Sequence, residues 1–419
     1  MRHDESPTLS PPTAPGTPTS DSPTPGPSPW VLRILTVGLV LAALNLRPAI
    51  TSLGPLLEEV RDTLHMSGSV AGVLTSVPPL CFAVFGFMAP RLARRFGPGA
   101  VICAGMVAIA SGLLLRPFVG GTAGFLAASA LALMGIAVSN VLMPVIVKRW
   151  FPDRVGTVTG LYSMALALGT ALAAALTVPL TDALGGSWKT GLAVWAGLAA
   201  VAILPWLPFV KDRRNASGPA AGAPAPALRI TRSRTSWALA CFFGLQATAA
   251  YITMGWMPQI FRDAGIAAGT AGVLLAVTMA MGVPLAFVIP RVATRLRTQG
   301  PIVLVLSSCG LLGYGGLYLA PAGGAWVWAL LLGIANCAFP LALTMIGMRA
   351  GTGAGVVRLS AFAQSTGYLL SIPGPLLVGV LYQHSGGWGL PLTLMAALLV
   401  PQTVAGMLAG RDRKIEDEC

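Results

Sequence analysis

Arg47 lies deep inside the first long apolar run of the chain, Trp30 to Leu53. An ionised side chain inside a bilayer is costly, so such a residue is by default a functional-site hypothesis. Asn45, Pro48 and Thr51 surround it and add an amide, a helix-breaking proline and a hydroxyl. A proline frees a backbone carbonyl that only a protein cavity can satisfy at membrane depth. The segment therefore predicts a polar binding site in a membrane-spanning helix, with Arg47, Asn45 and Thr51 as substrate-binding residues.

The composition predicts that most of the chain lies in a lipid bilayer. Of the 419 residues, 55% are hydrophobic and only 10% are charged, and the mean hydropathy is +0.75. Soluble domains are typically about a quarter charged. The net charge of +13 could suggest nucleic acid, but the basic residues are scattered among apolar runs without an aromatic-basic stripe. No nucleic-acid partner is expected.

Windows of about twenty residues pick out about twelve apolar spans, which predict an all-α membrane protein built from two six-helix bundles. The expected spans lie near residues 31–53, 70–90, 99–117, 122–147, 156–180, 190–210, 235–257, 268–290, 301–320, 325–347, 357–381 and 389–409.

Stretches of different composition divide the spans into domains. Residues 1–29, rich in Pro, Ser and Thr, predict a disordered cytoplasmic tail, and 411–419 predict a second short tail. Residues 211–234 have basic ends and an Ala/Pro/Gly middle, as expected of a flexible cytoplasmic linker. The linker separates an N-terminal bundle over 30–210 from a C-terminal bundle over 235–410.

The basic residues predict the orientation. All but five of the 27 Lys and Arg residues fall in segments that would share one side of the membrane. By the positive-inside rule, this side is the cytoplasm, and both termini lie there in a multi-pass cell-membrane protein. The exceptions are Arg47, Arg61, Arg116, Lys189 and Arg262. Arg116, at the outer end of the third span, is interpreted as interfacial, and steering of anions inward is its alternative role.

The two halves repeat. The sequence Ala-Gly-Val-Leu occurs at 71–74 and again at 271–274, and Pro90-Arg91 recurs as Pro290-Arg291. Several matches in the same order are not easily accidental. Duplicated bundles around a midplane site are typical of alternating-access transporters.

Four longer segments, 45–57, 89–97, 148–163 and 363–382, resemble the cyanate-permease and nitroimidazole-transporter family of the major facilitator superfamily. The similarity runs from residue 31 to 409. It implies a secondary transporter, working as a monomer, for a small anion or polar heterocycle. In this superfamily certain helices face a central cavity, which adds seven candidate substrate-binding residues: Asn140, Tyr162, Gln246, Tyr251, Asn336, Gln364 and Tyr368.

The chain departs from the superfamily pattern after the second span. The pattern has a glycine, an acidic residue and a basic cluster, but here Pro90 occupies the acidic position. Arg91, Arg94 and Arg95 remain candidates for a gating role in this cytoplasmic loop. Their alternative role is only to set the topology.

Each candidate residue also has a purely structural interpretation. Arg47 could snorkel to the outer headgroups or pair with Glu58 or Glu59. Asn140, Asn336, Gln246 and Gln364 could equally form structural hydrogen bonds between helices. All 14 acidic residues fall in tails, loops or helix ends. A buried proton relay and a cationic substrate are therefore not expected.

Other classes of function fit less well. A drug or metabolite exporter of the same fold remains the alternative. An intramembrane enzyme would need a nucleophile near a His or a carboxylate at depth, and the spans offer none. A receptor would need a larger soluble output domain. The six cysteines form no metal-binding pattern, and no cofactor is expected.

Overall fold

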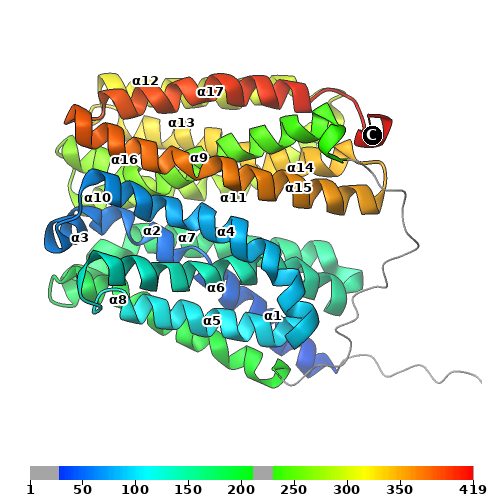
Figure 1. The fold of residues 1–419 in the computed structure, drawn as a ribbon, viewed down its shortest axis with the longest axis horizontal. Helices are drawn as coiled ribbons and strands as arrows, with labels where there is room; N and C mark the ends of the chain where they lie inside the picture. The colour runs from blue at the N-terminus through cyan, green and yellow to red at the C-terminus, as the bar shows by residue number, and fades with distance from the viewer. Residues whose placement is uncertain (1–27, 211–229, 419) are drawn as a thin grey trace, which may run out of the picture.

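The computed structural model describes residues 28–210 and 230–418. Residues 1–27 of the predicted tail and 211–229 of the predicted linker therefore lie outside the described residues. The last residues of the predicted linker, 230–234, form a short 3₁₀ helix and the start of the next span. In the described part, 12 helices are long and apolar enough to cross a membrane, which confirms the number that the sequence predicts. The helices of the two halves form two groups that lie side by side (Figure 1).

The first six spans contain eight α-helices. These are α1 (Pro29–Asn45), α2 (Pro48–Thr51), α3 (Leu57–Leu64), α4 (Gly68–Phe96), α5 (Pro98–Leu115), α6 (Gly121–Trp150), α7 (Val155–Ala183) and α8 (Trp188–Ile203). The last six contain nine. These are α9 (Arg234–Asp263), α10 (Ala268–Ala280), α11 (Gly282–Arg295), α12 (Gly300–Leu319), α13 (Ala325–Asn336), α14 (Ala338–Arg349), α15 (Gly353–Ser371), α16 (Pro373–Ser385) and α17 (Gly389–Ala409).

Four spans are interrupted near their middle, between α1 and α2, α10 and α11, α13 and α14, and α15 and α16. Prolines explain the first and third breaks. Pro48 has no N–H for the carbonyl of Leu44, and Pro340 has none for the carbonyl of Asn336. The Gln246 amide donates to the freed Asn336 carbonyl at 3.0 Å. A side chain of a neighbouring helix thus satisfies a backbone group that lipid cannot.

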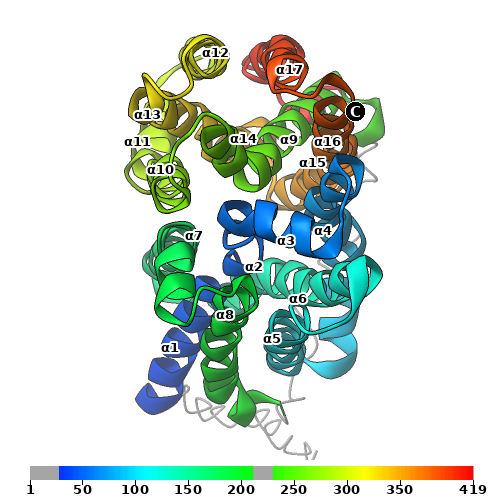
Figure 2. The same cartoon turned by 90° about the vertical axis from the view of Figure 1, so that its left-hand side faces the viewer.

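The molecule has two distinct ends, which we call the α3 end and the tail end (Figure 1). The α3 end carries α3, and the tail end carries residues 411–418. Figure 2 views the two bundles from the α3 end. Polar contacts between the bundles gather there: Ser69 donates to the Gln383 amide oxygen at 2.8 Å, and the Trp256 indole donates to the Thr75 hydroxyl at 3.2 Å. The bundles are therefore closed against each other at the α3 end.

The repeated Ala-Gly-Val-Leu sequence marks two matching contacts between the bundles. A Cβ atom on Gly72 would lie 2.9 Å from the carbonyl oxygen of Leu376 in α16. One on Gly272 would lie 2.4 Å from the carbonyl oxygen of Ala174 in α7. Only glycine allows backbones to approach so closely, so each copy of the motif provides one close contact with the opposite bundle.

The C-terminal residues dock on the tail end of the second bundle. Ile415 is fully buried. The Glu416 carboxylate accepts hydrogen bonds from the backbone N–H groups of Gly351 and Thr352 at the start of α15. The Glu418 carboxylate accepts from the Ser233 hydroxyl at 2.6 Å and from the Thr235 backbone N–H at 3.0 Å, at the start of α9. Two tail carboxylates thus cap two helix N-termini.

We expect the docking of this tail to depend on pH. Burial raises the pKa of Glu418, but the hydrogen bonds from Ser233 and Thr235 outweigh it and hold the pKa below its usual value. A depressed pKa stabilises the docked state above the ordinary glutamate value of about 4.3, and this stabilisation is lost as pH falls through the lowered value. The protection of the Thr235 amide, which is its exchange rate compared with that of an unfolded peptide at the same pH, should therefore fall on acidification of the native protein.

Glu418→Gln should exchange faster already at pH 7 and lose this pH dependence. Asp417→Asn is the matched control, since Asp417 is an exposed neighbour outside the described hydrogen bonds to α9. Equal protection of Thr235 in all three proteins at pH 7 would contradict the role of the Glu418 carboxylate as a cap.

Candidate functional site

Arg47 lies at the break in the first span, between α1 and α2, where its backbone leaves the helical conformation (φ −125°, ψ −25°). Its side chain is half-buried. The guanidinium lies close enough to act electrostatically on the Tyr251 hydroxyl of α9 and on Tyr368 of α15. A cation from the first bundle thus meets two phenols from the second.

Aromatic rings extend this site. The Tyr368 ring stacks on Phe82 of α4, with ring centroids 5.0 Å apart and an interplanar angle of 24°. Phe243 of α9 meets the same tyrosine edge-on at 5.2 Å. Both Tyr251 and Tyr368 are buried. A guanidinium, two hydroxyls and aromatic faces can bind a small anion or a flat, electron-rich ring.

Asn45 and Thr51, predicted beside Arg47, turn their donors to the backbone. The Asn45 amide donates to the carbonyls of Leu41 and Leu198 at 2.8 and 3.3 Å. The Thr51 hydroxyl donates to the Arg47 carbonyl at 3.1 Å. Both side chains are fully buried. Their bonds hold the interrupted span in shape around Arg47.

Gln246 and Asn336 lie in a polar cluster inside the second bundle. The Gln246 amide donates to the side-chain oxygen of Asn336 at 2.7 Å and accepts from Gln402 of α17 at 3.1 Å. These bonds, with that to the Asn336 carbonyl, match the structural alternative for both residues. Neither is brought to Arg47 by the described contacts.

The remaining predicted substrate-binding residues lie on three helices. Gln364 is half-buried on α15, and its amide donates to the Ser360 hydroxyl at 2.6 Å. Asn140 on α6 and Tyr162 on α7 are half-buried. Of the predicted set, the described contacts therefore bring Arg47, Tyr251 and Tyr368 together.

Glu58 and Glu59 bind Arg262 rather than Arg47. The Arg262 guanidinium contacts the Glu58 carboxylate at 2.8 Å and the Glu59 carboxylate at 2.9 Å, and it donates to the Pro55 carbonyl at 2.9 Å. This ion-pair cluster joins the two bundles at the α3 end. The alternative in which Glu58 or Glu59 neutralises Arg47 is therefore wrong.

The three loop arginines lie exposed at the tail end of α4. Arg91 lies over the Phe87 ring, 4.3 Å from its centroid, and Arg95 lies over Phe96 at 5.2 Å. Arg94 is their exposed neighbour. Pro90 lies inside α4 and does not end the helix. Arg91 and Arg95 are thus held near aromatic rings of their own helix.

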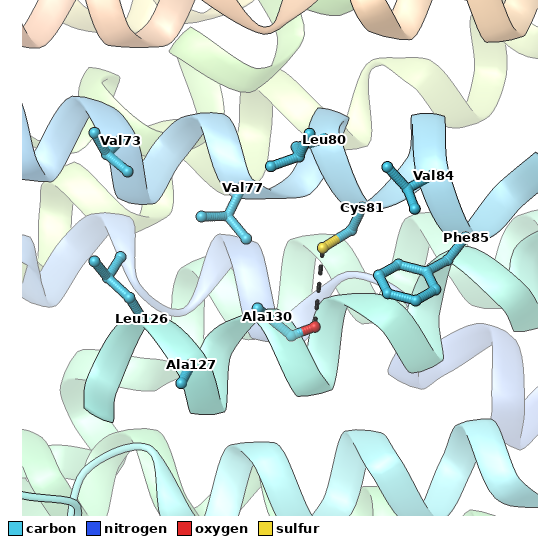
Figure 3. Close-up of a pocket in the computed structure, with 9 residues that line it drawn as sticks. All are labelled: Val73, Val77, Leu80, Cys81, Val84, Phe85, Leu126, Ala127 and Ala130. Carbon is cyan, nitrogen blue, oxygen red and sulfur yellow. Dashed lines mark hydrogen bonds between the residues drawn. The ribbon is translucent and has the colours of Figure 1, made fainter. Parts of the chain in front are cut away.

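A large apolar groove lies between α4 and α6 (Figure 3). Its volume is about 420 Å³, and its lining is apolar, with Val73, Leu80 and Phe85 among the residues. The Cys81 thiol is directed at the Ala130 carbonyl at 3.9 Å. This groove offers no charge to an anion, so its size does not make it the candidate site.

Arg116 is the main residue whose environment the sequence analysis missed. It is only 1% exposed, so the interfacial interpretation is wrong. Its Nη1 group donates to the Ala49 carbonyl at 2.8 Å. That carbonyl is free because α2 ends after one turn and the Leu53 N–H bonds to Ile50. The break in the first span therefore provides the buried acceptor that Arg116 binds.

Comparison with known families agrees with this architecture. A sequence model of the Major Facilitator Superfamily matches residues 38–357. The chain belongs to this superfamily. The superfamily comprises transporters, so the chain is a secondary membrane transporter of a small solute and not an enzyme or a receptor.

Curated relatives within the superfamily cover nearly the whole chain. The chain is 37% identical over 386 residues to the uncharacterized transporter YycB of Bacillus subtilis (strain 168). This match covers 91% of the present chain and 94% of YycB. It is 33% identical to the 2-nitroimidazole transporter of Escherichia coli (strain K12), with coverage of 91% and 96%. Identity to the cyanate transport protein CynX of the same organism is 29%, with coverage of 84% and 90%. The predicted family is thereby confirmed.

Solved structures confirm the superfamily fold. The D-xylose–proton symporter superposes with a TM-score of 0.73 at 12% identity, covering 93% of this chain and 99% of that one. A bacterial homologue of the human lysosomal transporter Spinster also gives 0.73, at 14% identity, with coverage of 91% and 97%.

Proposed function

We propose that this transporter carries a small anion or a polar heterocycle, and that Arg47 binds it. The observation that carries this proposal is the guanidinium of Arg47 between the two bundles. The ion pairs among residues 28–210 and 230–418 use Arg262 and Arg349, which leaves the charge of Arg47 to a ligand. An anion between Arg47, Tyr251 and Tyr368 would contact both bundles, as alternating access requires.

The named relatives support this class of substrate. One transports 2-nitroimidazole and another cyanate, according to their names. Both solutes are small and offer electron-rich atoms to a guanidinium, and the imidazole ring is flat enough to stack on Tyr368 or Phe82. Export of drugs or other metabolites is less well supported, because neither name describes such a role.

A thermal-shift experiment tests the proposal. Purified full-length protein is heated with sodium cyanate, sodium formate, 2-nitroimidazole or, as a cationic control, choline chloride. A ligand at 100 times its dissociation constant adds about 2.7 kcal/mol to the free energy of unfolding. We expect a shift with at least one anion or heterocycle and none with choline. Stabilisation by choline alone would overturn the proposal.

We further propose that the tail end faces the cytoplasm of a cell-membrane protein that works as a monomer. The basic loop residues of α4 and α11, at one end of the spans, support this orientation through the positive-inside rule. Both walls of the Arg47 site come from one polypeptide, which supports a monomer as the working unit.

Thiol labelling checks this orientation. We expect Gly387→Cys, in a background without the native cysteines, to react with an impermeant thiol reagent in intact cells. Arg295→Cys in the same background should react only after the cells are opened. Labelling of Arg295→Cys alone in intact cells would reverse the orientation. Light scattering of the purified protein would measure its oligomeric state.

A further inference from the structure

Arg116 has two guanidinium nitrogens without partners. Its Nη1 group donates to Ala49, but Nε and Nη2 are buried and have no hydrogen-bond partner. The Phe125 ring, 5.7 Å from the guanidinium carbon, is its aromatic neighbour. A buried charge with unsatisfied donors is expensive. The single bond to Ala49 explains one edge of the guanidinium and leaves the other edge available to a ligand.

Arg116 lines a cavity between the bundles. The cavity has a volume of about 20 Å³, and its lining includes Arg116, Ser129 and Thr75 from the first bundle and Tyr251 and Gly255 from the second. The Ser129 hydroxyl is also buried, 3% exposed, and has no partner. A space of this size holds one water-sized group. Two unsatisfied donor groups thus meet a space for one small ligand.

The chemistry of the cavity favours an anion over water. Water could accept one hydrogen bond from each donor, but it would leave the positive charge uncompensated. A small monovalent anion accepts hydrogen bonds from the guanidinium and the hydroxyl and also neutralises the charge. We propose that Arg116 and Ser129 form a second anion-binding site, separate from Arg47 and nearer the α3 end.

The position of this second site suggests its role in transport. Tyr251 lines the cavity beside Arg116 and also feels the charge of Arg47, so one phenol neighbours both arginines. The contact between Trp256 and Thr75 joins the bundles beside the cavity. When the α3 end opens, an anion reaches Arg116 first and then passes Tyr251 to Arg47. This role rests on the proposed function, whereas binding of the anion at Arg116 does not.

Bromide is a suitable probe because its anomalous scattering locates it directly. Crystals of the full-length protein grown in sodium bromide should show one peak at Arg116 and Ser129 and one at Arg47. A peak at Arg47 alone would overturn the second site and leave the proposed function intact. A peak at Arg116 alone would support the second site and count against Arg47 as the binding residue. Absence of both peaks would overturn both.

Variants test the same site in solution. Thermal shifts are measured as sodium bromide replaces sodium gluconate, whose anion is too large for the cavity, at constant ionic strength. Ser129→Ala keeps the Arg116–Ala49 bond and should weaken bromide binding by about 10- to 100-fold, as expected for one hydrogen bond to an ion. Arg116→Met should abolish the high-affinity component.

Ser111→Ala is the matched control, because the Ser111 hydroxyl on α5 bonds to its own helix at Val107. It should respond to bromide like the native protein. If Arg116→Met does not fold, Ser129→Ala and the diffraction peak still decide the matter. A native bromide response in Ser129→Ala, together with no peak at Arg116, would reduce Arg116 to a brace between α5 and α2.

Discussion

Arg47→Gln is expected to lower the affinity for an anionic substrate by about 10- to 100-fold, because a hydrogen bond to a charged group contributes about 1.5–3 kcal/mol. Folded yield should not fall. On translocon scales, inserting an arginine at the centre of a membrane helix costs roughly 2.5 to 3.5 kcal/mol. The glutamine variant removes the insertion cost of this charge from the protein without substrate.

Arg47→Lys separates charge from geometry. Lysine keeps the positive charge but loses the planar fork of the guanidinium, so we expect a smaller loss of affinity, about 3- to 10-fold for a loss near 1 kcal/mol. Arg33→Gln is the control, because Arg33 is an exposed arginine of the same span. Titration calorimetry with cyanate, or with another anion that stabilises the native protein, measures all three variants. Native affinity in Arg47→Gln would assign the residue to the lipid interface.

Gly272→Leu is expected to abolish transport while leaving the protein folded. A Cβ at this position would lie 2.4 Å from the Ala174 carbonyl of the opposite bundle, a distance that real side chains do not tolerate. The two bundles could then no longer approach each other at the α3 end. Each bundle keeps its own core, so the variant should fold but fail to close at the α3 end. Gly72→Leu should act in the same way through Leu376.

A reporter cysteine measures this failure to close. Thr75 is buried under Trp256 at the contact between the bundles. Thr75→Cys is introduced in a background without the native cysteines. With the native Gly272 it should resist an impermeant thiol reagent, and with Gly272→Leu it should become reactive. Gly315→Leu is the matched control, because a Cβ on this helical glycine meets no atom within 4 Å. Unchanged protection in Gly272→Leu, with transport intact, would show that the contact is not needed for closure.

Local patterns in the sequence predict much of this molecule. Hydropathy alone gives the twelve spans, and a charged residue beside Pro48 identifies the break where Arg47 lies. The sequence predicts part of the role of Gln246. Pro340 stands four residues after Asn336, so the Asn336 carbonyl must lack its helical hydrogen bond. The sequence does not say which side chain will satisfy that carbonyl, because the choice depends on how α9 packs against α13.

The sequence does not predict ion pairs and hydrogen bonds between residues that are far apart in the chain. Glu59 and Arg262 are 203 positions apart, and nothing local to either residue indicates the pairing. Arg116 was misjudged for a related reason. Its place at the end of a span suggested contact with headgroups, whereas the free carbonyl of Ala49, which depends on the one-turn length of α2, draws it inward.

The docked C-terminal tail also affects the order in which the chain matures. Glu416 and Glu418 follow every membrane span in the sequence, yet they cap the first turns of α15 and α9. During synthesis those spans enter the bilayer long before their caps leave the ribosome. The start of the second bundle therefore acquires its final hydrogen bonds only after translation has passed the last helix. Ribosome-stalled chains that end before residue 415 should leave this end of the nascent transporter accessible to quality-control proteases.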